Sequence, residues 1–267
     1  MPLTLAAKSG PALRAEINAA EIPIGNVGVW WLGQATFCFK FGATILFTDP
    51  FYSNDARHPG MLCESPLKPE QFSGASIICC THDHLDHIDP ETLPGACAAS
   101  PNARLVLPRW HMDFVAKLGV SRERMDAMRG DDSIEIAGLK IHAIPCAHES
   151  LEYSEQHGHR YLGYIFEGHG ARIYLAGDIQ PYPGWYERIV KFPRFDAAFL
   201  PISARDNLHY RQAVYFCALH RPALAVPMHY NMFPAYTEDP QKFVAALKLN
   251  CPDQRVKVMT LGKGWTV

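Results

Sequence analysis

Residues 75–90 read ASIICCTHDHLDHIDP, with two cysteines and three histidines inside nine positions. The apolar first part predicts a strand, and the H-x-H-x-D-H pattern after it contains His82, His84, Asp86 and His87. Imidazole nitrogens and carboxylate oxygens are ligands for metals of borderline softness. Alternate residues at a strand end point the same way, so the first two histidines can serve one ion while the turn carries the other two side chains toward a second. The stretch therefore predicts half of a two-metal site, and a surface loop that is histidine-rich by accident is the improbable alternative.

The cysteines of this stretch are expected to be structural. Cys79 and Cys80 end the strand on opposite faces, so we expect them to pack without sharing a metal or forming a disulfide. The sequence has no C-x-x-C pair, which is the usual spacing of zinc knuckles and redox-active thiols. Scattered cysteines on apolar segments indicate small buried residues in a reducing compartment, and the eight are Cys38, Cys63, Cys79, Cys80, Cys97, Cys146, Cys217 and Cys251.

Length and composition favour one domain over residues 1–267, with residues 1–25 as a short amphipathic lead-in. The chain is 48% hydrophobic, and its formal net charge of −2 comes without a run of Lys or Arg. A nucleic-acid partner is therefore not expected, because such proteins normally carry a basic patch. No apolar run approaches the roughly 18 residues of a membrane span. Lys8 and Pro11 interrupt the first apolar stretch, so the sequence predicts a cytoplasmic protein.

Strands and helices alternate along the rest of the chain. Short β-branched and aromatic segments at 27–33, 35–42 and 44–50 predict a meander, in which Trp30 and Trp31 face opposite sides of the sheet. Further strands are expected at 76–80, 104–108, 133–138, 139–145, 161–168, 171–178, 196–201, 223–229 and 256–261. Helices are expected at 90–98, 110–118, 185–190, 211–219 and 241–249, and long loops at 51–72, 149–160 and 202–210. This order predicts two sheets with helices outside them.

Three more polar residues follow apolar strands, and they can complete the metal site. His148 follows IHAIPCA, Asp178 follows RIYLAG, and His229 follows ALAVPM. Taken singly, each is as well explained as an ordinary loop or turn residue. All three stand at the carboxyl end of a strand, where side chains can reach one edge of a sheet. Their common placement makes them candidate metal ligands.

In this order, THDHLDH, His148, the Gly177-Asp178 pair and His229 resemble the metallo-β-lactamase superfamily over most of the chain. The resemblance implies an α/β fold, a four-layer αββα sandwich of two mixed sheets with helices outside and metals at one sheet edge. It also implies two bound ions. One would be held by His82, His84 and His148, the other by Asp86, His87 and His229, with Asp178 bridging both.

Two families within the superfamily are similar to this chain. VWWLGQATFCFKFG, THDHLDHID and GVSRERMDAMRGDDSIEIAGLKIHA resemble the L-ascorbate-6-phosphate lactonase family. GQAT, FTDPFYS and FDAAFLPISA resemble the N-acyl-phosphatidylethanolamine phospholipase D family. The lactonase carries an acidic residue where this chain has His148, and residues 49–76 form a shorter stretch here. The resemblance implies a metal-dependent hydrolase of an ester or lactone, with a phosphodiesterase as the alternative.

The expected chemistry is hydrolysis by a hydroxide that bridges two divalent ions about 3.5–4 Å apart. Imidazole-rich ligation favours Zn²⁺, with Mn²⁺ second. Asp86 and Asp178 are the expected catalytic carboxylates, and Asp86 could orient the nucleophile or accept its proton. Flavodiiron relatives carry an acidic residue in place of His84, whereas persulfide-dioxygenase relatives keep a similar histidine motif, so iron-dependent oxygen chemistry stays open. A non-catalytic metal-binding scaffold is disfavoured because all seven ligand positions are filled.

The substrate is expected to be a small molecule, with or without a phosphate, and the sequence leaves a homo-oligomer open. SARDNLHY contributes the candidates Arg205, Asn207 and His209, and HYNMF contributes Tyr230. The Arg205 fork suits a phosphate or carboxylate, although an ordinary surface salt bridge explains it equally well. Tyr230 could donate to an oxyanion or simply pack. The histidines of EQHGHR (155–160) are expected to be exposed on a loop that covers the site.

Overall fold

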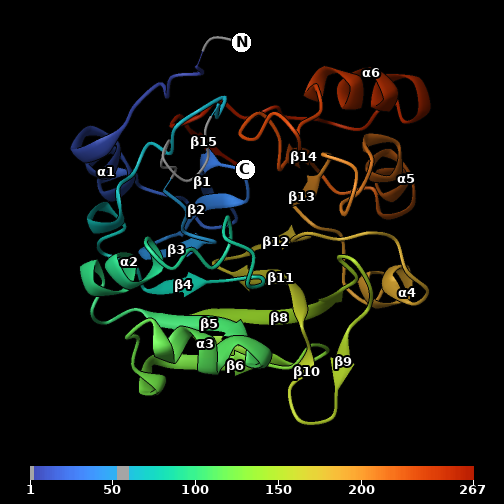
Figure 1. Ribbon diagram of the computed structural model, residues 1–267. Coiled ribbons are helices and arrows are strands. Elements are labelled where there is room, and N and C mark those ends of the chain that lie inside the picture. Colours follow the sequence, from blue (N-terminus) through green and yellow to red (C-terminus); the bar gives the residue numbers. More distant parts are fainter. Residues whose placement is uncertain (1–2, 53–59) are drawn as a thin grey trace.

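The computed structural model describes residues 3–52 and 60–267, and their strands form two large sheets packed face to face. The predicted loop at 51–72 falls in part on residues 53–59, which lie outside the described residues. In Figure 1 the earliest strands belong to the first sheet, the chain then crosses into the second, and its last strand returns to the first. The layers are those of the expected αββα sandwich.

The first sheet has the strand order β15-β1-β2-β3-β4-β5-β6. Antiparallel pairing joins the predicted meander, whereas β3 to β6 pair in parallel. The strands are β1 (Gly28–Gly33), β2 (Thr36–Phe41), β3 (Thr44–Thr48), β4 (Ile77–Cys79), β5 (Arg104–Pro108), β6 (Met125–Met128) and β15 (Gly264–Thr266).

The second sheet has the order β14-β13-β12-β11-β8-β7. Hairpins pair β7 with β8 and β11 with β12, as predicted, and β12 to β14 are parallel. The strands are β7 (Ser133–Ile136), β8 (Leu139–Cys146), β11 (Tyr161–Gly168), β12 (Ala171–Leu175), β13 (Ala197–Pro201) and β14 (Ala225–Met228). A separate small hairpin consists of β9 (Tyr153–Ser154) and β10 (Gly158–His159).

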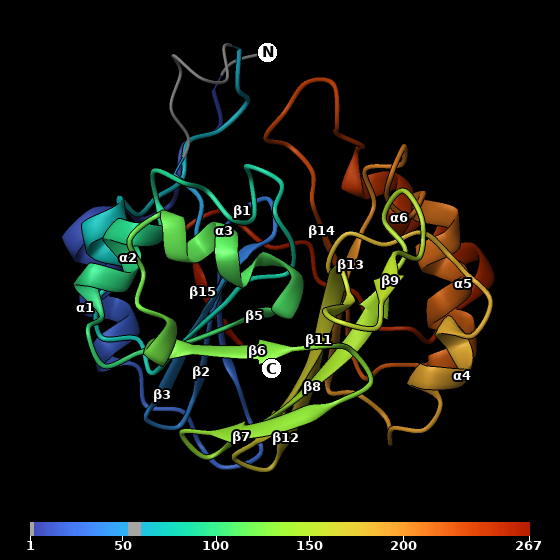
Figure 2. The same ribbon diagram turned by 60° about the horizontal axis from the view of Figure 1, so that its bottom comes forward.

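Helices cover the outer face of each sheet. Figure 2 shows α1 (Gly10–Ala19), α2 (Leu93–Ala99) and α3 (Met112–Lys117) outside the first sheet. On the opposite side of the molecule, α4 (Trp185–Ile189), α5 (Tyr210–His220) and α6 (Pro240–Asn250) lie outside the second sheet. Single 3₁₀ turns occur at Pro69–Gln71, Arg109–His111 and Arg122–Arg124. In the described part of the chain, no helix is both long and apolar enough to cross a bilayer.

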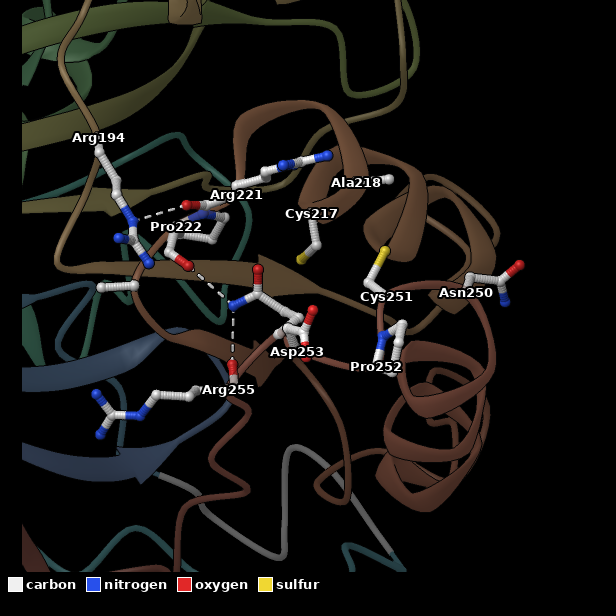
Figure 3. Close-up of a pocket in the computed structure, with 12 residues that line it drawn as sticks. Arg194, Cys217, Ala218, Arg221, Pro222, Asn250, Cys251, Pro252, Asp253 and Arg255 are labelled. Atoms are coloured by element: carbon white, nitrogen blue, oxygen red, sulfur yellow. Dashed lines mark hydrogen bonds between the residues drawn. The ribbon is translucent and has the colours of Figure 1, made fainter.

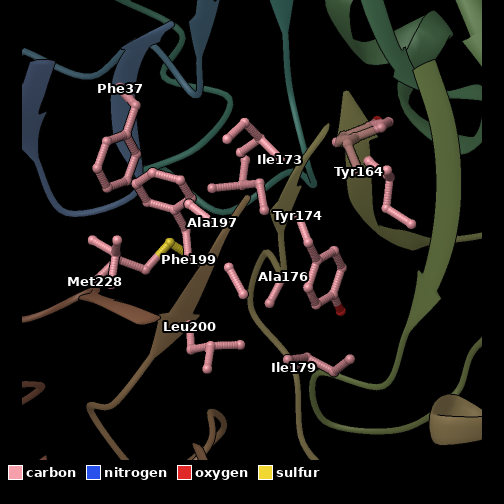
Figure 4. Close-up of a cluster of buried hydrophobic side chains, with 14 of the residues drawn as sticks. Phe37, Tyr164, Ile173, Tyr174, Ala176, Ile179, Ala197, Phe199, Leu200 and Met228 are labelled. Atoms are coloured by element: carbon pink, nitrogen blue, oxygen red, sulfur yellow. The ribbon is translucent and has the colours of Figure 1, made fainter. Parts of the chain in front are cut away.

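Two apolar cores hold the layers together. The larger lies mainly between the sheets and includes Phe37, whose ring meets that of Phe199 edge-on at a centroid distance of 4.9 Å. Figure 4 shows these two rings side by side among aliphatic residues of β12 to β14. The smaller core lies beneath α1 to α3. Trp31 belongs to the larger core and Trp30 to the smaller, which confirms that the pair faces opposite sides of the sheet.

The cysteines are buried, free thiols, with the partial exception of Cys251. Cys79 packs in the core between the sheets and Cys80 in the core beneath the helices. The two side chains therefore point to opposite faces of the strand, as expected, and neither belongs to the histidine and aspartate cluster described below.

The strand predicted at 256–261 is wrong. Val256 makes one isolated bridge to Ala225, and the terminal strand is instead β15, which pairs with the edge of the first sheet at β1. Strand β6, which reads MDAM, was not expected because it lacks the β-branched residues that mark strands. The predicted loop at 149–160 contains the short strands β9 and β10.

Candidate metal centre

The candidate ligands reach one edge of the sandwich from both sheets. Strand β4 ends at Cys79, and the following segment turns so that the amide nitrogens of His87 and Ile88 both donate to the carbonyl of His84 at 3.0 Å. In the second sheet β8, β12 and β14 run in the same direction, because β11 is antiparallel to both β8 and β12. Their carboxyl ends deliver the remaining three ligands, which are His148, Asp178 and His229.

Six of the seven side chains form two groups of three, and the seventh lies between the groups. The ligand atoms of His82, His84 and His148 lie within 4.8 Å of one another, and those of Asp86, His87 and His229 form a second such group. Within the first group, His84 Nδ1 is 3.1 Å from His148 Nε2. Within the second, Asp86 Oδ2 is 3.6 Å from His87 Nε2 and 3.5 Å from His229 Nε2. This division is the one that the sequence resemblance implies.

Asp178 lies between the two groups. Its Oδ2 atom is 3.7 Å from His148 Nε2 in the first group, and 3.5 Å from His87 Nε2 and 3.1 Å from His229 Nε2 in the second. Asp178 also forms a candidate metal-binding triad with His82 and His87. One carboxylate is therefore within reach of both groups.

Unsatisfied buried atoms at the centre of the cluster fit a bound cation. His82 Nε2 and Asp178 Oδ1 are buried and make no hydrogen bond to any described residue. A buried nitrogen or oxygen without a partner is costly, and native structures rarely leave one. Imidazole nitrogen and carboxylate oxygen are both good ligands for divalent transition metals. The residues present therefore suit metal ions, and the cluster could bind them.

The electrostatics of the cluster favour a cation. Burial opposes protonation of the histidines, yet the carboxylates of Asp178 and Asp86 raise the pKa of His87 well above its usual value and that of His229 to about 9. Burial likewise opposes ionisation of the two aspartates, but the neighbouring histidines hold the pKa of each carboxyl below its usual value. At neutral pH the protons on His87 and His229 thus balance the two ionised carboxylates, and a metal ion bound here would replace those protons.

Asp49 supports the cluster from below, and sequence reasoning did not identify it as a site residue. It is fully buried, and its carboxylate accepts hydrogen bonds from Thr81 N at 2.7 Å and Thr81 Oγ1 at 2.8 Å. His87 Nδ1 lies 2.8 Å from Asp49 Oδ2, which directs His87 Nε2 toward Asp178 and Asp86. A carboxylate partner on the far nitrogen is a common way to orient a metal-binding histidine. The signal was present, because Asp49 directly follows the apolar strand β3.

Other supporting contacts come from distant loops. Gln34 Nε2 donates to Asp86 Oδ2 at 3.0 Å, and Ser203 Oγ lies 3.0 Å from His229 Nδ1. The backbone carbonyl of Asp206 is 2.7 Å from His148 Nδ1. These partners orient candidate ligands in both groups of the cluster.

Backbone strain is concentrated around the cluster. Gln34, Asp49 and His229 have φ angles of 51°, 38° and 59°, in the left-handed region that residues other than glycine rarely adopt. Such strain persists only where the surroundings enforce it, and it is common at functional sites. Here the strained residues are the candidate ligand His229 and the two supporting residues Gln34 and Asp49. This placement is consistent with a functional site.

The four predicted substrate residues have different surroundings. Asn207 is buried, donates to Asp178 Oδ2 at 2.9 Å and accepts from the Ile179 amide at 3.0 Å, so it positions a candidate ligand. His209 is the N-cap of α5 and accepts from the Arg211 amide. Tyr230 is buried with its ring 4.9 Å from that of Trp31. The exposed Arg205 places its guanidinium 4.6 Å from the ring centre of Tyr236.

A pocket of about 500 Å³ opens over the cluster. Asn207 lines it, whereas Arg205, His209 and Tyr230 are not among the described residues that do. The lining combines candidate ligands with acidic and apolar side chains, and consists of Gln34, Asp83, His84, Leu85, Asp86, His148, Glu149, Asp178, Ala204, Asp206, Asn207, His229, Phe233 and Tyr236.

The loop expected to cover the site contacts the segment that carries the first candidate ligands. Arg160, which follows β10, lies within 3.2 Å of Asp83 and of Glu152. The ring of Tyr161 packs against those of His82 and His148, each at a centroid distance of 5.4 Å. This segment therefore forms a wall behind the first group of histidines.

A second cavity, of about 370 Å³, lies at the amino ends of β13 and β14, opposite the ligand cluster (Figure 3). Arg194, Arg221 and Arg255 are among its lining residues, but Figure 3 shows their guanidinium groups in three separate places. Gln254 Nε2 instead bonds to backbone carbonyls, which belong to Pro222 and Arg255. This cavity has no convergent chemistry comparable to that of the cluster.

Several known proteins are similar to this chain in sequence or in fold. A metal-dependent hydrolase from Caldivirga maquilingensis, of the group named UPF0173, is 28% identical over 87% of this chain and 94% of its own. One from Methanosarcina mazei is 26% identical over 90% of this chain and 98% of its own. The solved structure of a metallo hydrolase from Ignicoccus hospitalis superposes with a TM-score of 0.73 at 23% identity, covering 91% of this chain and 98% of that one. The profile of the β-lactamase superfamily domain matches residues 44–230, so the chain belongs to the metallo-β-lactamase superfamily.

Proposed function

We propose that the protein is a metal-dependent hydrolase that cleaves an ester or lactone at the histidine and aspartate cluster. The observation that carries the proposal is the convergence of seven candidate ligand side chains, in two groups with Asp178 between them, of which five line an open pocket. The similar chains from Caldivirga maquilingensis and Methanosarcina mazei, which are named metal-dependent hydrolases, support the reaction class.

The proposed cofactor is a pair of divalent ions. His82, His84 and His148 would hold one ion, Asp86, His87 and His229 the other, and Asp178 both. Five of the seven ligands are imidazoles, which favours Zn²⁺, while the two carboxylates also admit Mn²⁺. When bound, such a pair supplies a water of lowered pKa and a Lewis acid for the carbonyl oxygen.

The two carboxylates would have different tasks in this reaction. The Asp178 side chain is 3% exposed and is held by Asn207, which suits a fixed ligand. The Asp86 side chain is 19% exposed, lines the pocket and is held by Gln34. Asp86 is therefore the residue placed to orient the attacking water and to take its proton, which then passes to the alkoxide released when the carbonyl C–O bond breaks.

A phosphodiesterase is the second candidate. Leu85, Phe233 and Tyr236 add apolar side chains to the pocket lining, which suits the hydrocarbon part of a phospholipid-like substrate. The same ligand cluster can activate water toward phosphorus as well as toward a carbonyl carbon. Substrate tests must therefore include both classes of bond.

The test is a substrate panel on the full-length protein loaded separately with Zn²⁺ and Mn²⁺. The panel contains uncharged esters, sugar lactones with and without a phosphate, and phosphodiesters. We expect hydrolysis of an ester or lactone, and its loss in H84A and D86A with the folded state retained by circular dichroism. H169A is the matched control, because His169 lies in the turn between β11 and β12 and contacts the Ile22 carbonyl. Unchanged turnover in H84A or D86A of verified metal content would refute the proposal.

A further inference from the structure

The rim of the pocket carries acidic charge beyond the candidate ligands. Asp83, Glu149 and Asp206 line the pocket in addition to Asp86 and Asp178. Among the described residues, no Lys or Arg lines it. Glu149 and Asp206 are exposed and form no ion pair with any described residue. The rim outside the candidate ligands is therefore negatively charged, above the positions that metal ions would occupy.

Neither of the two nearby arginines is among the residues that line the pocket. Arg160 is 3.2 Å from Asp83 and 3.2 Å from Glu152, so its single positive charge is shared between two carboxylates. Arg205 is stacked over the ring of Tyr236, and its carbonyl accepts a hydrogen bond from Gln180. The basic residue that the sequence suggested as a phosphate or carboxylate clamp thus has an aromatic partner and does not line the pocket.

Part of the pocket lining is apolar and accessible. Leu85 is 50% exposed even though it stands between His84 and Asp86, and Tyr236 is 42% exposed. Phe233 lines the same pocket, and its ring centre lies 6.0 Å from that of Phe51. Exposed apolar side chains at the mouth of a polar site are a common way to bind the hydrocarbon part of a ligand.

We infer that the pocket selects an uncharged ester or lactone with an apolar acyl or aryl group, and disfavours substrates with a phosphate or carboxylate. The inference rests on the proposed function and names the substrate class of that same site. An anionic group would lie close to Glu149 and Asp206, where like charges repel, whereas Leu85, Phe233 and Tyr236 would cover a hydrocarbon group.

The test compares matched substrates on the Zn²⁺-loaded full-length protein. The pair is p-nitrophenyl butyrate and the p-nitrophenyl monoester of succinic acid, which share a leaving group and differ by a terminal carboxylate. We expect kcat/KM to be about tenfold higher for the uncharged ester, and added salt to reduce the difference. Equal rates or a preference for the anionic ester would overturn the inference while leaving the proposed hydrolase in place. Failure of the metal-loaded protein to hydrolyse any ester, lactone or phosphodiester would overturn both.

Charge-neutralising variants identify the source of the selectivity. The selectivity is the ratio of kcat/KM for the uncharged ester to kcat/KM for the anionic ester. The double variant E149Q/D206N is expected to lower this ratio several-fold by raising kcat/KM for the anionic ester. D253N is the matched control, because Asp253 is an exposed acid beside the second cavity at the opposite end of the sheet. An unchanged ratio in E149Q/D206N, or an equal narrowing in D253N, would contradict the assignment to these two carboxylates.

The apolar part of the pocket lining has a separate test. Across p-nitrophenyl esters of increasing acyl length, kcat/KM is expected to rise in the native protein, and Y236A should flatten this rise. Y215A is the control, because Tyr215 is also an exposed tyrosine (56%) but lies on α5 and does not line this pocket. A dependence on acyl length that persists in Y236A, or is lost in Y215A, would count against binding of the acyl chain by the apolar residues of this pocket.

Discussion

At the residue scale, six of the seven candidate ligands have a hydrogen-bond partner outside the ligand set among the described residues, and His84 is the exception. His87 illustrates such a partner, because its Nδ1 atom faces the buried carboxylate of Asp49 and its Nε2 atom faces the cluster. The Asp49 carboxylate is itself fixed by two hydrogen bonds from Thr81. A charged acceptor on the far nitrogen raises the basicity of the metal-facing nitrogen.

Replacement of Asp49 tests this contact. D49N preserves the shape of the side chain but removes its charge, so we expect metal affinity to fall by about 10–100-fold with hydrolysis falling in parallel. Isothermal titration of the metal-free protein with Zn²⁺ measures the affinity. D126N provides the control, because Asp126 forms a partly exposed pair with Arg104 at 2.7 Å, away from the cluster. Native affinity in D49N would show that Asp49 serves only packing.

The structure brings together the seven candidate ligands that the sequence singled out, whereas most of the residues that support them were not identified from the sequence. His148, Asp178 and His229 were identifiable because each follows an apolar strand, and the carboxyl ends of strands meet at one edge. The roles of Gln34 and Asn207 were not accessible in this way, since each depends on which distant loop lies against the cluster. Asn207 was singled out as a substrate residue, yet its amide binds Asp178.

At the element scale, α5 contains a titrating residue independent of the metal site. His220, the last residue of α5, stacks on Tyr186 and contacts Phe216, and its Nε2 atom is buried without a described hydrogen-bond partner. Burial lowers the pKa of His220 from 6.5 to about 4. The folded state therefore holds this imidazole in its neutral form more strongly than the unfolded state does.

This depressed pKa predicts a loss of stability in acid. Above pH 6.5 His220 is neutral in both states; as pH falls from 6.5 toward 4, the unfolded state takes up the proton first and is favoured. Urea unfolding measures the free energy of unfolding for the unchanged chain and for H220Q. As pH falls over this range, we expect the free energy of unfolding of the unchanged chain to decrease relative to that of H220Q. A difference that is constant between pH 7 and pH 4.5 would show that His220 is not buried as described.

Element prediction succeeded where periodicity was strong and failed at the margins of the first sheet. The hairpins β7-β8 and β11-β12 were clear from alternation and intervening glycines. The segment at 256–261 is apolar enough for a strand but makes only one bridge, whereas β15 contains a glycine and forms at the sheet edge through its pairing with β1. Whether a short edge segment forms a strand depends on the neighbouring strand with which it pairs. The local sequence does not reveal which strand that is.

At the scale of the whole molecule, the candidate metal centre joins the two sheets. His82, His84, Asp86 and His87 follow a strand of the first sheet, and the remaining three ligands follow strands of the second. Metal bound here would cross-link the two halves of the sandwich. A ligand that binds only the folded state stabilises it in proportion to the logarithm of its concentration over its Kd.

Metal removal should therefore lower the thermal stability. At a free metal concentration 100-fold above Kd, binding contributes about 2.7 kcal/mol, which corresponds to a Tm about 5–10 °C higher for a chain of this size. Calorimetry of the metal-free protein with and without added Zn²⁺ measures the shift. The double variant H84A/D178A should show little metal-induced rise in Tm. A rise in that variant equal to that of the unchanged chain would mean that the stabilising metal binds elsewhere.

The most direct test of the central claim is a metal titration of the metal-free protein, followed simultaneously by metal analysis and hydrolysis of an uncharged ester. The account predicts negligible hydrolysis without metal and a rise to a plateau at two equivalents of Zn²⁺ or Mn²⁺ per chain, with both the second equivalent and the activity lost in D178A. Full hydrolysis by verified metal-free protein, or a plateau reached with no metal retained at the cluster, would contradict it.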